Sequence, residues 1–214
     1  MPAAEWLQRI GVVPFILKYR LSDFGDPAPL QDVLRAIRLI RSRADELGIN
    51  PDQIGLLGFS AGGHLAACAA GRFDQPEGKT GSPLDRVDGR PTFVALIYPV
   101  VTLVGPFAHE NSRRNLIGDS ASAKRVDELS LDRATISNYC PTFIVHTLAD
   151  TIVPAENSIL LWQALRREHV QVELHIYEEA PHGFAFDPSF GPASGWPKRC
   201  EEWMARHKWL PGAN

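Results

Sequence analysis

A serine flanked by glycines stands at residues 58–62, where the sequence reads Gly-Phe-Ser-Ala-Gly. This G-x-S-x-G pattern is typical of a nucleophilic serine on a sharp turn between a strand and a helix. The context agrees, because an apolar run at 54–59 precedes Ser60 and small, helix-favouring residues follow at 65–70. The motif can also mark an ordinary strand–helix turn, but this context favours a nucleophile. We therefore predict that Ser60 attacks a carbonyl carbon and that the Ala61 N–H stabilises the oxyanion.

A serine hydroxyl needs a base to take its proton, and the chain has seven histidines. His182 is favoured, because it follows a predicted strand in a loop between a proline and a glycine. His64 stands in the helix after the serine and is a minor alternative. His146 ends a strand and is expected to pack, while His109 could contact a substrate. The other three are predicted to lie on the surface: His169, His175 and His207.

Asp150 is the predicted partner of His182, because a histidine base needs an acceptor that fixes its tautomer. It follows the apolar run at 142–146, at the carboxyl end of a predicted strand. Each residue also has a simpler explanation, since Asp150 could cap the helix that begins near Pro154 and His182 could cap a turn. The chain order Ser60, Asp150, His182 on successive strand ends favours a triad.

Alternating apolar runs and helical patterns position these residues. Strands are predicted at 12–19, 54–59, 92–98, 142–146 and 172–177, and helices at 4–10, 30–47, 155–168 and 196–209. The alternation predicts an α/β fold, a mostly parallel sheet with helices on both faces, in one domain spanning 1–214. Residues 100–138 break the pattern, with one short helix at 123–129, and are expected to form a cap-like or substrate-facing excursion. The arginines on the polar face of the second helix are expected to be solvated: Arg35, Arg38, Arg41 and Arg43.

Bulk properties narrow the class of protein. The chain has 214 residues, of which 44% are hydrophobic, and a net charge of -3, so nothing in its charge suggests nucleic acid or an anionic membrane as partner. No apolar run is long enough to span a bilayer, and the amino terminus lacks a signal-peptide pattern. Three widely spaced cysteines fit core positions in a reducing cytoplasm better than disulfides or a zinc site. We expect no metal or cofactor.

With these motifs the chain resembles the α/β-hydrolase superfamily, and within it the small bacterial acetyl esterases and acetyl xylan esterases. The resemblance covers nearly the whole chain and is carried by segments 18–21, 58–66, 112–118, 150–154 and 181–184. It implies a serine esterase of short acyl groups, with a small-molecule ester as substrate and Ser60, His182 and Asp150 as the triad. Four residues are expected to contact the substrate: Phe59, Tyr19, His109 and Phe184.

One departure from that group concerns the oxyanion site. No H-G-G-G-type loop precedes Ser60, and we expect the leading strands of the group to be absent, one of which lies between the 12–19 and 54–59 strands in related folds. Either the 12–19 strand moves over to pair with 54–59, or another subunit fills the gap, so we expect a homo-oligomer, a dimer. A second oxyanion donor would come from the loop at 19–22 or from a partner chain. The alternatives to an esterase are a degenerate hydrolase that binds a ligand or partner with little turnover, and a peptidase.

Overall fold

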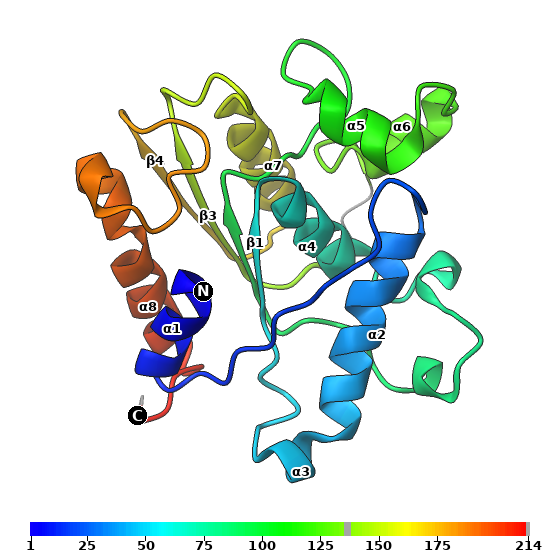
Figure 1. Ribbon diagram of the computed structural model, residues 1–214, viewed down its shortest axis with the longest axis vertical. Coiled ribbons are helices and arrows are strands. Elements are labelled where there is room, and N and C mark those ends of the chain that lie inside the picture. The colour runs from blue at the N-terminus through cyan, green and yellow to red at the C-terminus, as the bar shows by residue number, and fades with distance from the viewer. Residues whose placement is uncertain (135–137, 213–214) are drawn as a thin grey trace.

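The computed structural model describes residues 1–134 and 138–212 of the chain. Four parallel strands form one sheet in the order β1-β2-β3-β4 (Figure 1). Their bounds are Leu56–Phe59 for β1, Val94–Ile97 for β2, Thr142–Thr147 for β3 and Val172–Tyr177 for β4. Each strand follows its predecessor in sequence and in space, with a crossover between them, so all four carboxyl ends lie at one edge of the sheet.

Eight α-helices accompany the sheet in the described residues. They are α1 (Pro2–Arg9), α2 (Ala28–Ser42), α3 (Ala44–Leu47), α4 (Ser60–Arg72), α5 (Glu110–Ile117), α6 (Ala123–Leu129), α7 (Glu156–Arg167) and α8 (Trp196–Arg206). Three short 3₁₀ segments add Pro76–Gly78, Pro83–Arg86 and Pro188–Gly195. The predicted helices are confirmed, including the short one in the excursion, whereas α5 was not predicted.

Two apolar cores lie on opposite faces of the sheet. Side chains alternate along β2, so Val94 and Leu96 join the core beneath α2, α4 and α7, whereas Ala95 and Ile97 join the core beneath α1 and α8. Figure 1 shows the same division, with α1 and α8 on one side of the sheet and α2 and α4 on the other. The predicted α/β class is therefore confirmed. The three cysteines are free and buried in these cores, as expected.

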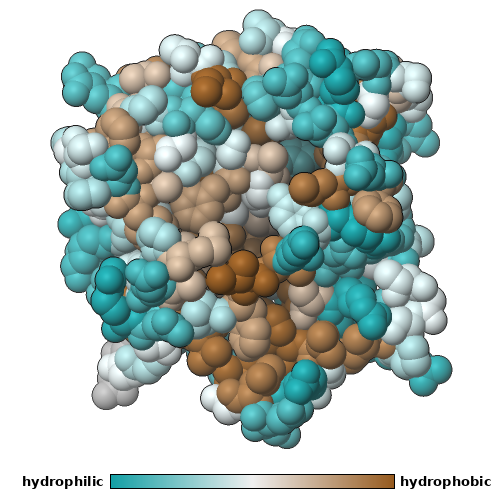
Figure 2. All heavy atoms as spheres, viewed as in Figure 1, coloured by the Kyte–Doolittle hydropathy of each residue, from teal (hydrophilic) through white to brown (hydrophobic). Residues whose placement is uncertain are grey.

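The segment 12–19 is not a strand, which corrects the first predicted strand. No residue from 13 to 19 makes a backbone hydrogen bond within the described chain, and β1 pairs only with β2. The ends of the segment are fixed elsewhere, because the Val12 N–H donates to Leu7 O at 2.9 Å and the Arg20 N–H donates to Asp32 of α2 at 2.8 Å. The predicted move to pair with 54–59 is thus wrong. Apolar side chains of this segment remain exposed, Ile16 by 66% and Val13 by 52%. Figure 2, in the same view as Figure 1, shows an apolar patch in the lower centre of the molecule.

The excursion carries α5 and α6 beside the end of the sheet where α4 begins (Figure 1). Val126 and Leu129 of α6 pack into the core beneath α4. Arg125, which is partly buried, forms ion pairs with Asp26, with Glu77 at 3.2 Å and with Glu128 at 2.9 Å. A network of this kind fixes the position of α6 against the start of α2 more firmly than an isolated surface pair would.

Arg38 departs from the expectation of a solvated arginine face, because it is only 2% exposed. Its guanidinium donates to Gly78 O at 2.9 Å and to Phe73 O at 3.3 Å, and it pairs with Asp85 at 3.3 Å. The loop after α4 folds back over this face of α2, so the arginine satisfies carbonyls that would otherwise be buried without donors.

Candidate active site

Ser60 lies on a strained turn between β1 and α4. Its φ of 52° is in the left-handed region, which costs a non-glycine residue free energy and is typical of functional turns. The turn is tight, because a Cβ on Gly58 would lie 2.4 Å from Gly62 O and one on Gly63 would lie 2.9 Å from the Pro99 side chain. The Val100 N–H donates to Ser60 O at 3.2 Å and ties the turn to the residues after β2. Close approach therefore requires glycine at positions 58 and 63, whereas a Cβ on Gly62 would meet only the Tyr19 hydroxyl at 3.8 Å.

Ser60, His182 and Asp150 form one continuous chain of hydrogen bonds. Ser60 Oγ lies 2.8 Å from His182 Nε2, and His182 Nδ1 lies 2.6 Å from Asp150 Oδ2. A carboxylate only accepts, so Nδ1 carries the proton and Nε2 presents its lone pair to the serine hydroxyl. The three side chains come from positions 60, 150 and 182, and the carboxyl ends of β1, β3 and β4 bring them together. This is the geometry of a serine that a histidine base can activate.

Asp150 uses its two oxygens for different contacts. Oδ1 accepts from the backbone N–H groups of Ile152 at 3.0 Å and Val153 at 2.9 Å, so the aspartate does cap the turn before α7, as the simpler explanation held. Oδ2 faces His182 and, at 3.3 Å, His146 Nε2. Burial alone would raise the pKa of Asp150, but hydrogen bonds from His146, His182 and the Val153 N–H outweigh it and hold that pKa below its ordinary range. The carboxylate is therefore charged at neutral pH.

The loop that carries His182 is held by β2 and β3. Thr147 Oγ1 donates to Ala180 O at 2.8 Å, and Gly183 adopts a φ of 83°, which a glycine tolerates. The Tyr98 ring packs edge-on against the His182 imidazole, with centroids 4.8 Å apart. Tyr98 follows β2 directly and has a φ of 40°. The sequence pattern did not lead us to predict Tyr98 as a residue of the site, although its position directly after a buried strand could have indicated it.

The residues expected to contact substrate fall in different environments. Phe59 is partly buried and packs against Tyr98, with ring centroids 5.9 Å apart. Tyr19 is partly buried, and its hydroxyl lies 3.8 Å from the position of a Cβ on Gly62. Phe184 is 1% exposed and packs beneath Tyr98, so it offers almost no surface to a substrate, which corrects that expectation.

His109 stands just before α5, where its Nδ1 lies 2.8 Å from Ser112 Oγ. Burial lowers the pKa of His109, the charge of His182 lowers it further, and Asp150 opposes the shift. His182 and Asp150 thus act electrostatically on His109, and contact between His109 and a substrate stays a prediction. His64, the minor alternative for the base, is buried in α4 and binds Leu129 O at 2.9 Å instead.

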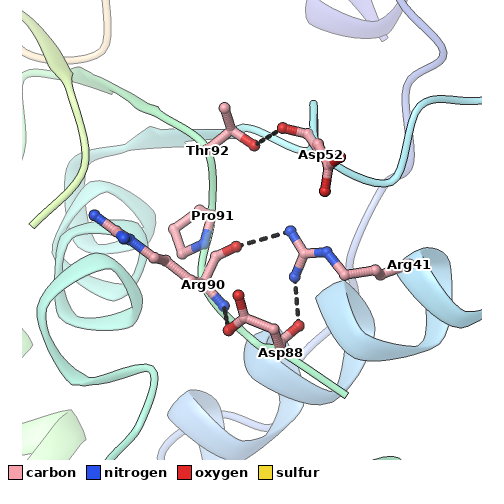
Figure 3. Close-up of a pocket in the computed structure, with 6 residues that line it drawn as sticks. All are labelled: Arg41, Asp52, Asp88, Arg90, Pro91 and Thr92. Carbon is pink, nitrogen blue, oxygen red and sulfur yellow. Dashed lines mark hydrogen bonds between the residues drawn. The ribbon is translucent and has the colours of Figure 1, made fainter. Parts of the chain in front are cut away.

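A cavity of about 320 Å³ lies away from the triad (Figure 3). Asp52 precedes β1 and Thr92 precedes β2, so this cavity is at the amino edge of the sheet. Arg41 points into it, but its guanidinium donates to Pro51 O at 2.9 Å, to Arg90 O at 2.8 Å and to Asp88 O. Because the Arg41 guanidinium binds three backbone carbonyls, its role here is structural: it holds the segments that line the cavity together. In the described chain, no group of three or more His, Cys, Asp or Glu side chains could hold a metal ion.

A serine on a strand–helix turn, served by a histidine and an aspartate from later strand ends of a parallel sheet, defines the serine hydrolases of the α/β-hydrolase fold. Residues 5–165 match the BD-FAE family, and the chain belongs to that family. Residues 126–210 also match the dienelactone hydrolase family. The resemblance read from the sequence motifs is thus confirmed.

Two curated relatives are enzymes of xylan metabolism by name. The chain is 33% identical to endo-1,4-beta-xylanase B of Butyrivibrio fibrisolvens over 95% of this chain and 33% of that protein. It is 32% identical to an acetylxylan esterase of Xylanibacter ruminicola over 88% of this chain and 38% of that protein. The chain therefore spans little more than a third of the length of these relatives.

Solved structures of named esterases and hydrolases share the fold. An acetyl ester-xyloside bifunctional hydrolase from Caldicellulosiruptor lactoaceticus superimposes with a TM-score of 0.92 at 40% identity, covering 98% of this chain and 77% of that one. An esterase from Thermogutta terrifontis does so with a TM-score of 0.81 at 25% identity, covering 98% and 77%. These names support the predicted class, a carboxylic ester hydrolase.

Proposed function

We propose that this protein is a serine esterase that hydrolyses short-chain, acetyl-type esters through Ser60, His182 and Asp150. The observation that carries the proposal is the pair of short contacts, 2.8 Å from Ser60 to His182 and 2.6 Å from His182 to Asp150. The relatives named acetylxylan esterase and acetyl ester-xyloside hydrolase support an acetyl ester as substrate. An acetylated xylan fragment is therefore the substrate class to test first.

The reaction follows from which atoms carry protons. Ser60 Oγ forms a bond to the ester carbonyl carbon while His182 Nε2 takes the hydroxyl proton. The carbonyl oxygen becomes an oxyanion, which the Ala61 N–H can bind, because the first N–H groups of α4 have no partner within the helix. Collapse expels the alcohol, which receives the proton from His182 and leaves an acyl-enzyme. Water, activated by His182 in the same way, then releases the acid.

Turnover and covalent labelling test the proposal together. We expect release of p-nitrophenolate from p-nitrophenyl acetate, faster than from longer acyl esters, and labelling of Ser60 by a fluorophosphonate, which reacts with an activated serine. Absence of both would favour the alternative, a degenerate hydrolase that binds a ligand or partner without turnover. Labelling combined with cleavage of amides in preference to esters would favour a peptidase.

Tyr19 is our proposed second oxyanion donor. Its hydroxyl lies beside Gly62, two residues after the nucleophile, and burial raises the pKa of Tyr19, so the hydroxyl stays protonated and able to donate at neutral pH. Tyr19→Phe removes that donor and keeps the ring. We expect kcat on p-nitrophenyl acetate to fall by about 10²-fold with little change in KM, as on loss of one oxyanion donor. The same loss in Tyr177→Phe, a tyrosine of β4, would instead indicate a general effect of removing a hydroxyl.

We propose that two copies of the chain associate through the apolar surface at residues 13–17. In the described residues β1 pairs on one side only, and a short run of the chain carries four exposed apolar side chains: Val13, Phe15, Ile16 and Leu17. Light scattering at micromolar concentration is expected to give the mass of a dimer. Ile16→Lys should shift it to the monomer, whereas Leu39→Lys, which alters an exposed leucine of α2, should not. A monomeric wild type would reject the interface.

Location and the role of the excursion are also proposals. Each helix of the described residues is too short or too polar to cross a bilayer. We propose the cytoplasm as the compartment, which three unpaired thiols support. We further propose that the described part of the excursion, residues 100–134 and 138, forms the substrate-facing wall, because α5 and α6 lie beside the end of the sheet where α4 begins (Figure 1). Residues 135–137 of the predicted excursion lie outside the described residues.

A further inference from the structure

His146, a residue that the sequence pattern assigned to packing, contacts the catalytic acid. Its side chain on β3 is 0% exposed, so it does pack as expected. Its ring nitrogens nevertheless have two hydrogen-bond partners and one charged neighbour: Nδ1 lies 2.7 Å from Ser158 Oγ, and Nε2 lies 2.8 Å from Val153 O and 3.3 Å from Asp150 Oδ2. A buried histidine with every polar atom paired is held in a single orientation.

The partners determine where the proton of His146 lies. A carbonyl oxygen only accepts, so Nε2 carries the proton and donates it to Val153 O, while Asp150 Oδ2 lies 3.3 Å from the same nitrogen. In the neutral ring Nδ1 then accepts from the Ser158 hydroxyl. Ser158 belongs to α7, so the imidazole links that helix to the aspartate.

The contacts close a loop around Asp150. The Val153 N–H donates to Asp150 Oδ1 while Val153 O accepts from His146, which in turn reaches Oδ2. The carboxylate thus receives two backbone donors on Oδ1 and the His182 Nδ1–H on Oδ2, and Oδ2 also faces the N–H edge of the His146 imidazole at 3.3 Å. With three hydrogen bonds and the His146 imidazole around it, the plane of the carboxylate is fixed relative to His182.

We infer that His146 is a positioning residue: its Nε2–H, anchored on Val153 O and 3.3 Å from Asp150 Oδ2, holds the Asp150 carboxylate in the plane in which Oδ2 receives the His182 Nδ1–H. The inference rests on the proposed esterase function for its kinetic consequences. His146 touches no substrate, so its removal affects the orientation and charge of Asp150 and leaves substrate binding unchanged.

Two variants of one residue test this. His146→Leu removes the donor, and we expect kcat to fall by about 10- to 100-fold, the usual effect of losing a supporting partner, with KM within about twofold. His146→Gln keeps an N–H near the Nε2 position and should recover most of that loss. His175→Leu is the matched control, because His175 on β4 binds Glu173 at 2.9 Å and does not touch the triad. Equal losses in the Leu and Gln variants, or an equal loss in the control, would overturn the inference.

The pH profile separates positioning from general damage. The titratable groups facing Asp150 are His146 and His182, and Tyr98 and His109 lie within electrostatic range. Without the His146 N–H beside Oδ2, more of the carboxylate charge acts on the imidazolium that forms during the reaction. The acid limb of kcat/KM should therefore move to higher pH in His146→Leu. A lower kcat with an unmoved limb would mean that His146 supports only the fold.

A spectroscopic measurement stands independently of turnover. The His182 proton shared with Asp150 over 2.6 Å should give a proton NMR signal far downfield, assigned by its loss in His182→Ala. We expect this signal to shift in His146→Leu and stay in place in His175→Leu. Should the wild type show no esterase activity, the proposed function fails, while this signal still decides the role of His146. Should His146→Leu not fold, Ser158→Ala is expected to shift the signal to a smaller extent, and an unchanged signal there overturns the inference.

Discussion

Ser60→Ala is expected to abolish hydrolysis of p-nitrophenyl acetate, with a loss in kcat on the order of 10⁶-fold. The variant removes the only atom that forms a covalent bond to the acyl group in the proposed reaction. His182 and Asp150 keep their own contact at 2.6 Å, so the rest of the site remains in place. KM should change little, because the hydroxyl contributes little to substrate binding before the chemical step.

Labelling and a matched serine variant make this result specific. Fluorophosphonate should label the wild type and Ser42→Ala, whose serine lies exposed at the end of α2, but not Ser60→Ala. Thermal unfolding should show that Ser60→Ala remains folded; its midpoint can even rise, since alanine replaces a residue in a strained turn. Equal rates for the wild type and Ser60→Ala would refute the assignment of the nucleophile.

Asp150→Asn is expected to lower kcat by about 10⁴-fold while the fold and KM are retained. An asparagine amide can donate to His182 Nδ1, and the imidazole then carries its proton on Nε2. That nitrogen would face Ser60 Oγ with an N–H in place of a lone pair, and it could not take the serine proton. The His182 ring would thus keep its wild-type position but could no longer act as a base.

The control for Asp150→Asn is Asp119→Asn, which alters an exposed carboxylate after α5 and should keep wild-type activity. Stability adds a second readout. Because the folded pKa of Asp150 lies below its ordinary value of 3.8, the charged form stabilises the fold above that pH, and the contribution is lost as pH falls through the folded pKa. Urea unfolding should show the wild type exceeding the variant most clearly at neutral pH. A variant with full activity would remove Asp150 from the triad.

Local pattern was sufficient to predict the elements that carry the triad. The glycines at 58 and 62, the apolar runs at 142–146 and 172–177, and the proline and glycine around His182 act over a few residues, so they are visible in the sequence. Their chain order placed nucleophile, acid and base at one sheet edge, because carboxyl ends of parallel strands coincide. The geometry of these three residues agrees with that prediction.

Contacts between segments distant in the sequence decided the features that local pattern did not predict. The run at 12–19 has the composition of a strand, but a strand forms only where a neighbour supplies backbone partners, and the contacts at Val12 and Arg20 hold this run elsewhere. Arg38 lies on the polar face of a helix, yet a loop 35 to 47 residues further on covers it. His146 reaches Asp150 because the turn before α7 folds back onto β3.

By itself, the sequence determined the strand–turn–helix around Ser60, the alternation that makes a parallel sheet, and the order of the three catalytic candidates. Only the tertiary structure decided which apolar runs found a pairing partner, which polar side chains were buried, and which groups surround the carboxylate of Asp150. The physical reason is range: backbone conformation and amphipathic pattern are set by neighbours in sequence, whereas hydrogen-bond partners and burial depend on residues brought together only when the chain folds.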